Sequence, residues 1–295
     1  MDNSTALYTN PTIEDVIVDE GKLTVGLNTS DANWTGITHI QLQYLSQLTD
    51  AEASAKAKEA LYAKLEDTGN MDTETNVGTE AFQIPETAVE AFDAAFDKAN
   101  DIYTNSQKVD EIEAATKALD EAIKAFQNPV LNAPKEDELF CIANISEGFG
   151  YKNNAVSPVY NEAKVEDGEY DLKWYHIVDA NYAQALKFTP VEGKKNQYTI
   201  SFIDEEGNTR YFSTQALAGY MDGGNVSTRH DRIRATKEAE KALPFEISLA
   251  GEGVYKLKNA LHGSNIGSTS DDGFFTTNNL SDLSLVKAEK ANVTL

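Results

Sequence analysis

Ala185-Leu186-Lys187-Phe188 returns as Ala242-Leu243-Pro244-Phe245, 57 residues further along the chain. Two aromatic residues downstream keep this spacing, since Tyr198 and Tyr255 are also 57 residues apart, and Phe140 precedes Tyr198 by 58. Each of the three aromatic residues opens a short run in which apolar and polar residues alternate, which is the period of a β-strand. A threefold repeat of short strands predicts three equivalent β-lobes, and it favours a binding module over a catalyst. An all-β sandwich would explain the alternation, but it would not require the same spacing twice.

The three strand openings define the repeat. Each opening is followed by a glycine that suits a hairpin turn, here Gly148, Gly207 and Gly263. The openings are Phe140-Cys141-Ile142-Ala143-Asn144, Tyr198-Thr199-Ile200-Ser201-Phe202 and Tyr255-Lys256-Leu257-Lys258-Asn259. The third copy is shorter, so we expect it to end with the strand Leu283-Ser284-Leu285-Val286 pairing against the first copy.

This pattern resembles the β-trefoil of ricin-type lectins over roughly residues 136–290. The resemblance implies a lectin-like scaffold of three lobes, each with an opening strand, a glycine hairpin and a later Ala-x-x-Phe strand. It does not carry over the sugar site, because the sugar-binding lobes of that family have an Asp after the opening strand and a Gln-x-Trp near the end. Here the opening positions hold Asn144, Phe202 and Asn259, and no Gln-x-Trp occurs in the chain.

The middle of the chain has the period of α-helices. Thr49-Asp50-Ala51-Glu52 is a capping box that predicts a helix to about Asp67, ended by Thr68-Gly69-Asn70. A polar loop of about fifteen residues then reaches Pro85, which suits the first turn of a second helix.

The next two helices are predicted by apolar stripes at steps of three and four residues, and they should form an antiparallel hairpin. The stripes are Val89, Phe92, Phe96, Ala99 and Tyr103, and then Val109, Ile112, Thr116, Leu119, Ile123 and Phe126. The simplest interpretation places their aromatic residues in the helical core, and the alternative makes them a glycan or protein contact.

Two further stretches resemble known modules of bacterial proteins. Residues 109–115 with 119–123 resemble the FIVAR-type helical modules of bacterial surface proteins. Residues 21–27, 33–35 and 40–45 resemble the last strands of the galactose-binding-like jelly rolls of secreted bacterial proteins, so only the end of such a domain would be present.

The predicted organisation is therefore a multidomain α and β chain. It has the C-terminal strands of a truncated jelly roll in residues 1–46, a three-helix FIVAR-like bundle in 47–128, a linker in 129–135 and a ricin-type β-trefoil in 136–295. Asn128-Pro129 and Ala133-Pro134 mark the linker, since proline cannot continue a helix.

Composition excludes several classes of function. With 25 Lys and Arg against 48 Asp and Glu, the formal charge of −23 repels nucleic acid and anionic lipid. The single cysteine, Cys141, excludes a disulfide framework, and the four histidines lie in separate contexts with no metal-site spacing. No apolar run reaches the ~20 residues of a membrane span, and the first residues lack the pattern of a signal peptide. We expect no metal and no cofactor.

Sugar binding needs an aromatic face together with planar amides or carboxylates. The candidate glycan-binding residues of these types are Trp174, Asp222, Asn225, Asp271, Asp272 and Asn278. The alternatives are that Trp174 is a packed strand aromatic residue and that the Asp and Asn residues are ordinary turn residues.

The expected function is a non-catalytic carbohydrate-binding or adhesion segment of a secreted or surface bacterial protein. Its partners would be glycans or host surface glycoproteins, and its location extracellular or on the cell surface. The alternative is a set of structural spacer modules for a carbohydrate-active enzyme or peptidase whose catalytic domain, such as a glycoside hydrolase, lies outside this chain. Direct catalysis would require a pocket with two converging carboxylates, and no catalytic motif occurs in the sequence.

Overall fold

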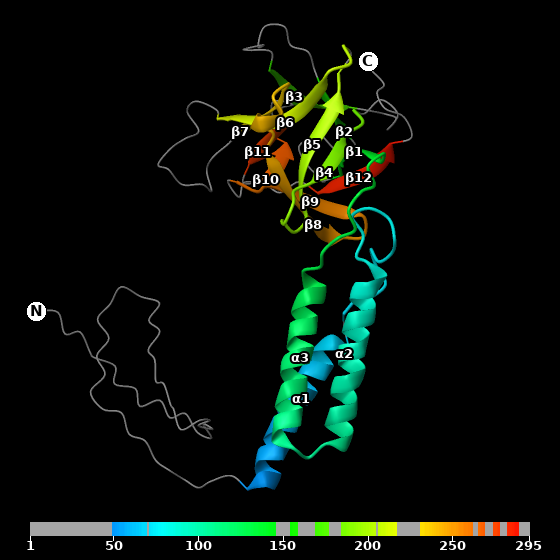
Figure 1. The fold of residues 1–295 in the computed structure, drawn as a ribbon, viewed down its shortest axis with the longest axis vertical. Coiled ribbons are helices and arrows are strands. Elements are labelled where there is room, and N and C mark those ends of the chain that lie inside the picture. The colour runs from blue at the N-terminus through cyan, green and yellow to red at the C-terminus, as the bar shows by residue number, and fades with distance from the viewer. Residues whose placement is uncertain are drawn as a thin grey trace, which may run out of the picture. The chain divides into compact units, whose positions relative to one another are not determined.

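The computed structural model describes residues 49–69, 71–145, 154–158, 169–176, 184–204, 206–216, 231–261, 265–268, 274–277 and 282–288. In this part of the chain, three helices are followed by a curled antiparallel sheet (Figure 1). The jelly-roll strands predicted for residues 1–46 lie outside the described residues.

The three helices are α1 (Asp50–Thr68), α2 (Glu86–Asn105) and α3 (Val109–Gln127). The predicted capping box is confirmed, because the Thr49 hydroxyl accepts a hydrogen bond from the Glu52 amide at 3.3 Å and the Thr49 amide donates to Oε2 of Glu52 at 2.8 Å. Pro85 immediately precedes α2, as its fixed backbone angle favours.

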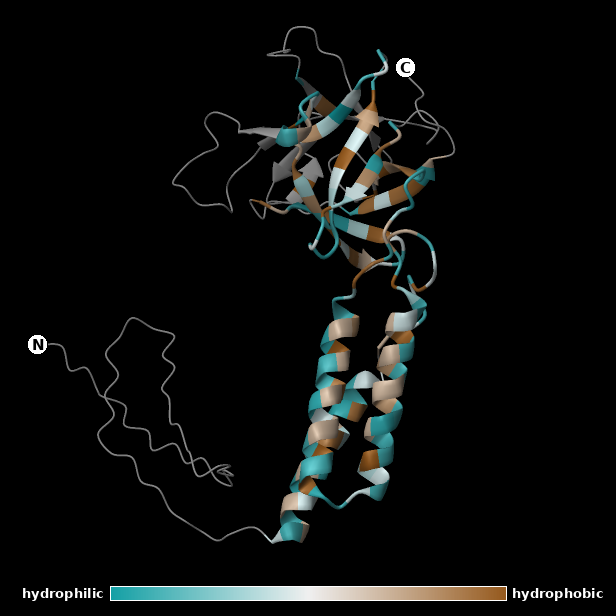
Figure 2. Ribbon diagram, viewed as in Figure 1, coloured by the Kyte–Doolittle hydropathy of each residue, from teal (hydrophilic) through white to brown (hydrophobic). Residues whose placement is uncertain are grey.

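The apolar stripes of α2 and α3 face the helical core. Phe92 and Phe126 are each 5% exposed, and their rings stack with centroids 5.1 Å apart. Phe96 and Tyr103 are partly buried against the same core. These aromatic residues therefore serve packing first, as the simplest interpretation of the stripes predicted, and Figure 2 shows the apolar positions recurring along the helices.

The sheet consists of short strands that span residues 139 to 288. Their bounds are β1 (Leu139–Asn144), β2 (Asn154–Pro158), β3 (Tyr170–His176), β4 (Lys187–Pro190), β5 (Gln197–Ile203), β6 (Thr209–Ala216), β7 (Asp231–Thr236), β8 (Pro244–Gly251), β9 (Val254–Asn259), β10 (Asn265–Ser268), β11 (Phe274–Thr277) and β12 (Leu283–Ala288). A single turn of 3₁₀ helix, Ala239–Lys241, precedes β8.

Six of these strands form a continuous series of antiparallel pairs around the sheet. β1 pairs with β12, β12 with β9, β9 with β8, β8 with β5, and β5 with β4. Phe140 and Leu186 then exchange two backbone hydrogen bonds of 2.8 Å, which brings the start of β4 back to β1. The pairing of the last strand with the first is confirmed, with Leu285 opposite Ile142.

The other six strands form three hairpins, β2–β3, β6–β7 and β10–β11. β7 joins these hairpins to one another, since it pairs with β3 through Tyr170 and Ala235 and with β11 through Phe275 and Arg232. Each hairpin follows one strand opening of the repeat along the chain.

The repeated residues occupy equivalent positions in β1, β5 and β9. Their aromatic residues are all buried, and the next inward-facing residues, Ile142, Ile200 and Leu257, are fully buried. The second part of the repeat places Phe188 in β4 and Phe245 in β8, again buried. The repeat found in the sequence is therefore a repeat of core positions.

The loop between α1 and α2 differs from the expectation of a polar loop. Phe82 is 1% exposed and Ile84 is also buried, and both belong to the hydrophobic core. Val77 and Ile84 form an isolated parallel β-bridge, which brings these two parts of the loop side by side. The polar residues of the loop led to the prediction, but its few apolar residues determine where it packs.

Candidate functional site

The candidate glycan-binding residues fall on the three hairpins or directly after one. Trp174 lies in β3, where its backbone is in register with Val156 of β2. Asp222 and Asn225 lie between β6 and β7, Asp271 and Asp272 between β10 and β11, and Asn278 just after β11. These last five residues lie outside the described residues.

The six strands that pair around the sheet carry none of these candidates. The candidates are instead spread over the three hairpins, whose strands β3, β7 and β11 are joined by direct pairing. Along the chain, each repeat contains at least one candidate, with Trp174 in a strand and the other five in the segments between or after strands.

The turn between β5 and β6 holds a buried ion pair. Asp204 is 4% exposed, and it accepts hydrogen bonds from Nε of Arg210 at 2.6 Å and from the Asn208 amide at 2.7 Å. Burial by itself raises the pKa of Asp204, but the hydrogen bonds from Arg210 and Asn208 outweigh it and hold the pKa below its ordinary value. Gly207 completes the turn with a positive φ of 81°. The carboxylate is therefore engaged by the protein's own donors and serves the turn.

Cys141 lies in β1 and is 5% exposed. Burial raises the pKa of its thiol to about 11. Because the thiolate is the reactive form, a thiol with this pKa is a weak nucleophile near neutral pH.

The residues that the structure describes contain no group of three or more His, Cys, Asp or Glu side chains arranged to hold a metal ion. Of the helices in that same part of the chain, none is both long and apolar enough to cross a bilayer.

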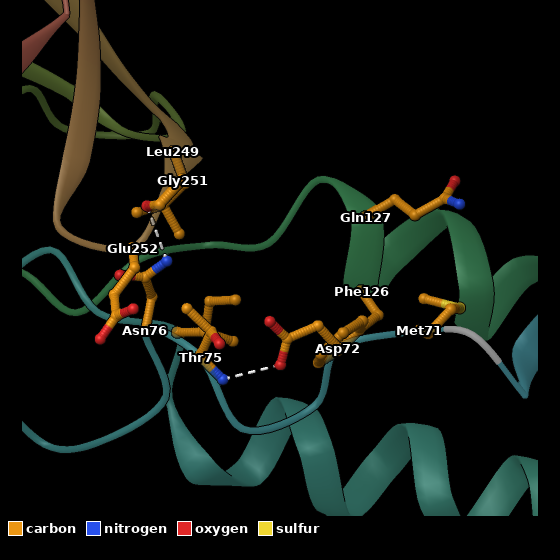
Figure 3. A pocket seen from close by; sticks show the side chains of 10 residues that line it. Met71, Asp72, Thr75, Asn76, Phe126, Gln127, Leu249, Gly251 and Glu252 are labelled. Carbon is orange, nitrogen blue, oxygen red and sulfur yellow. Dashed lines mark hydrogen bonds between the residues drawn. The ribbon is translucent and has the colours of Figure 1, made fainter.

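A shallow hollow of about 350 Å³ lies where the helices meet the sheet (Figure 3). Its walls come from the start of the α1–α2 loop, the end of α3 and the β8–β9 turn. The lining residues are Met71, Asp72, Thr75, Asn76, Ile84, Phe126, Gln127, Leu249, Gly251 and Glu252.

The polar groups of this hollow that Figure 3 joins by dashed lines form hydrogen bonds with other groups of the protein. Asn76 donates to the Gly251 carbonyl at 2.9 Å and accepts from the Gly253 amide at 2.7 Å. Asp72 accepts from the Thr75 amide at 2.8 Å and from the Glu74 amide at 3.0 Å. The hollow is thus part of a junction between helices and sheet, and these bonds serve that junction.

Phe82 is a core residue of this junction that the sequence prediction missed. Its ring lies edge-on to four others, with centroid distances of 5.0 Å to Phe140, 5.3 Å to Phe188, 5.5 Å to Tyr198 and 6.1 Å to Tyr255. The available signal was the group of apolar residues Ala81, Phe82 and Ile84 within an otherwise polar loop. Its partners are 58 to 173 positions away, so no local period identifies them.

Comparison with known proteins adds no relative. No model of a known protein family matches this chain, and no curated protein matches it either. The assignment of function therefore depends on the residues and the strand pairing described above.

Proposed function

We propose that this chain is a non-catalytic segment of a secreted or cell-surface bacterial protein that binds carbohydrate. In this proposal residues 136–295 are a ricin-type β-trefoil and residues 47–128 a FIVAR-like module. The strand pairing supports the trefoil, because six strands that pair one after another around a sheet, with three hairpins joined through β7, is the arrangement expected of three equivalent lobes.

The observation that carries the binding proposal is the position of the candidates on the hairpins. Trp174, Asp222 with Asn225, and Asp271 with Asp272 belong to the first, second and third hairpins of the repeat. An aromatic ring offers a face for the C–H side of a sugar, and amides and carboxylates bind its hydroxyls. The strongly acidic chain disfavours polyanionic glycans, so neutral polysaccharides are the expected ligands.

The test uses the complete chain on an array of neutral plant and host glycans, followed by calorimetry on any glycan retained. We expect Trp174→Ala to weaken binding at least tenfold, which corresponds to about 1.4 kcal/mol. Trp34→Ala is the matched control, because Trp34 lies in the N-terminal segment outside the proposed trefoil. Circular dichroism of both variants checks that the fold is retained.

One result would contradict the proposal as a whole, and a second would contradict the role of Trp174. Absence of binding to every neutral glycan on the array would count against carbohydrate recognition as a whole. Equal binding by Trp174→Ala and the unaltered chain would remove Trp174 from the site and direct attention to Asp222, Asn225, Asp271, Asp272 and Asn278.

The junction between helices and sheet favours the second candidate function, a structural spacer for a catalytic domain outside this chain. A spacer needs a fixed geometry, and the contacts of Phe82 and Asn76 restrict rotation at the junction. If this is the function, deleting residues 48–295 from a longer parent protein will impair its activity on surface-bound substrate and leave its activity on soluble substrate unchanged.

A further inference from the structure

We infer that the loop of residues 71–85 locks the helices onto the sheet, so that residues 48–295 fold as one cooperative unit with no free hinge at residues 129–135. This inference is independent of carbohydrate binding. It concerns how the chain between α1 and β12 holds together, and the contacts of three separate segments support it.

The first segment is the tip of the loop, where Phe82 completes the core of the sheet. Three of the four rings around Phe82 are the aromatic residues that open the three repeats, Phe140, Tyr198 and Tyr255. One side chain from outside the repeat thus contacts the equivalent residue of every repeat. If the helices moved away, this ring and its neighbours would become exposed to water, which strongly disfavours separation.

The backbone of the loop is shaped to present this ring. Phe82 has a positive φ of 64°, a conformation that a bulky residue adopts only where its surroundings impose it. Its amide donates to the Asn132 carbonyl at 2.8 Å, and the Asn132 amide donates to the Gln83 carbonyl at 2.8 Å. A Cβ at Gly78 would lie 2.3 Å from Oε1 of Gln83, so a larger residue there would displace the Gln83 side chain, which accepts from the Glu80 amide at 3.0 Å.

The second segment is 129–135, the predicted linker, which is hydrogen-bonded to both sides of the junction. Leu131 is 4% exposed, and its amide donates to Oδ1 of Asn196 at 2.9 Å. Nδ2 of Asn196 donates to the Pro129 carbonyl at 2.9 Å, while the Asn196 carbonyl accepts from the Ile247 amide in β8 at 2.9 Å. Rotation of the helices relative to the sheet about this segment would break these hydrogen bonds together.

The third segment is the base of the loop, which holds the β8–β9 turn through Asn76. Lys287 of β12 adds a charged contact, at 2.7 Å from Glu138 and 3.8 Å from Glu80 of the loop. The segment that connects α3 to β1 and the loop that connects α1 to α2 are therefore both held against the sheet by direct contacts. This arrangement predicts that local unfolding of one side destabilises the other.

The experiment measures hydrogen exchange by mass spectrometry on the complete chain at increasing urea concentration. Peptides from α2 and α3 report the unfolding midpoint of the helices, and peptides from β5 and β9 report that of the sheet. We expect one shared midpoint. We also expect Phe92→Ala, which truncates a buried ring wholly within the helices, to lower the sheet midpoint by the same amount as the helix midpoint.

Phe82→Ala is the matched variant at the junction, since it removes the same side chain at similar burial. We expect it to separate the two midpoints, because it removes the contact that couples them. If Phe92→Ala does not fold, the milder Ile112→Val provides the same comparison within α3. The inference is overturned if the midpoints differ in the unaltered chain, or if the helix truncation lowers the helix midpoint alone.

Discussion

Loop 71–85 and the β5–β6 turn bury side chains of opposite chemistry. Phe82 is 1% exposed among aromatic rings, whereas Asp204 is 4% exposed and paired with Arg210. Both loops contain a residue with positive φ, Phe82 itself and Gly207. Similar burial is thus reached in one case by transferring an apolar ring from water and in the other by satisfying a charge.

This difference indicates which contacts of the molecule are weakened by changes of pH and salt. The hydrogen bonds that surround Phe82 come from backbone groups and uncharged amides, so acid and ionic strength leave them intact. Asp204 stabilises the fold only while it is ionised. The contacts of Phe82 should therefore tolerate changes of solution that weaken the β5–β6 turn, whereas the ion pair of Lys287 with Glu138 at the same junction should weaken with it.

The largest expected effect comes from removing one member of the ion pair. Arg210→Met leaves the Asp204 carboxylate buried without its cation, and we expect a loss of about 3–5 kcal/mol in the free energy of unfolding, measured by urea denaturation. The double variant Asp204→Leu/Arg210→Met is the control, because it removes the uncompensated charge and should recover much of the loss. A single variant as stable as the unaltered chain would show that the pair does not hold the turn.

Lowering the pH should also destabilise the β5–β6 turn, but by less than the Arg210→Met substitution does. The pKa of Asp204 is lower in the folded than in the unfolded chain, so its stabilising contribution is present above the unfolded pKa of about 4 and is lost as pH falls through the folded pKa. The stability difference between the unaltered chain and Asp204→Asn should shrink between neutral pH and about pH 3. A difference that stays constant would mean that the pKa of Asp204 is the same in the folded and the unfolded chain. Phe82→Ala should show such a constant difference, which is the contrast between the two loops.

Asn196 tests the hydrogen bonds of the junction separately from its aromatic contacts. Asn196→Ala removes two side-chain hydrogen bonds at a position with φ of 52°, and we expect a loss of about 1–3 kcal/mol in thermal or urea unfolding. Asn196→Gly keeps the backbone conformation accessible, so it isolates the contribution of the side chain. If both variants unfold like the original chain, the aromatic contacts alone hold the junction.

The smallest effect is expected at the start of α1, far along the chain from both loops. Thr49→Ala removes the capping hydroxyl and should destabilise the protein by about 1 kcal/mol. Thr49→Ser, which keeps the hydroxyl, should restore most of this. Hydrogen exchange in the first turn of α1 measures the effect, and protection that does not change would mean that the capping box contributes little.

The sequence predicted the elements whose cause is local. The capping box and the apolar stripes gave the three helices, because these signals lie within a few residues of the structure they specify. The 57-residue repeat gave the strand openings and the closing pair of β1 with β12, because repeated core residues imply repeated strands.

Long-range packing was not predictable in the same way. The burial of Phe82 depends on four rings supplied by β1, β4, β5 and β9, and no period near residue 82 indicates them. Asn196 likewise looks like an ordinary turn residue until its bonds to Pro129 and Leu131 are seen. For the candidate site, the sequence identified residues on the three hairpins, and their role in binding stays a prediction.

The conformation of the α1–α2 loop is associated with a short pattern of residues in the sequence. A Cβ at Gly78 would displace the Gln83 side chain, Phe82 supplies the buried ring, and Pro85 immediately precedes α2. The spacing Gly-x₃-Phe-Gln-x-Pro is thus a fingerprint that can be searched for between two helices ahead of a threefold strand repeat. Chains that have diverged at other positions but retain this spacing would be recognisable as sharing this junction between helices and sheet.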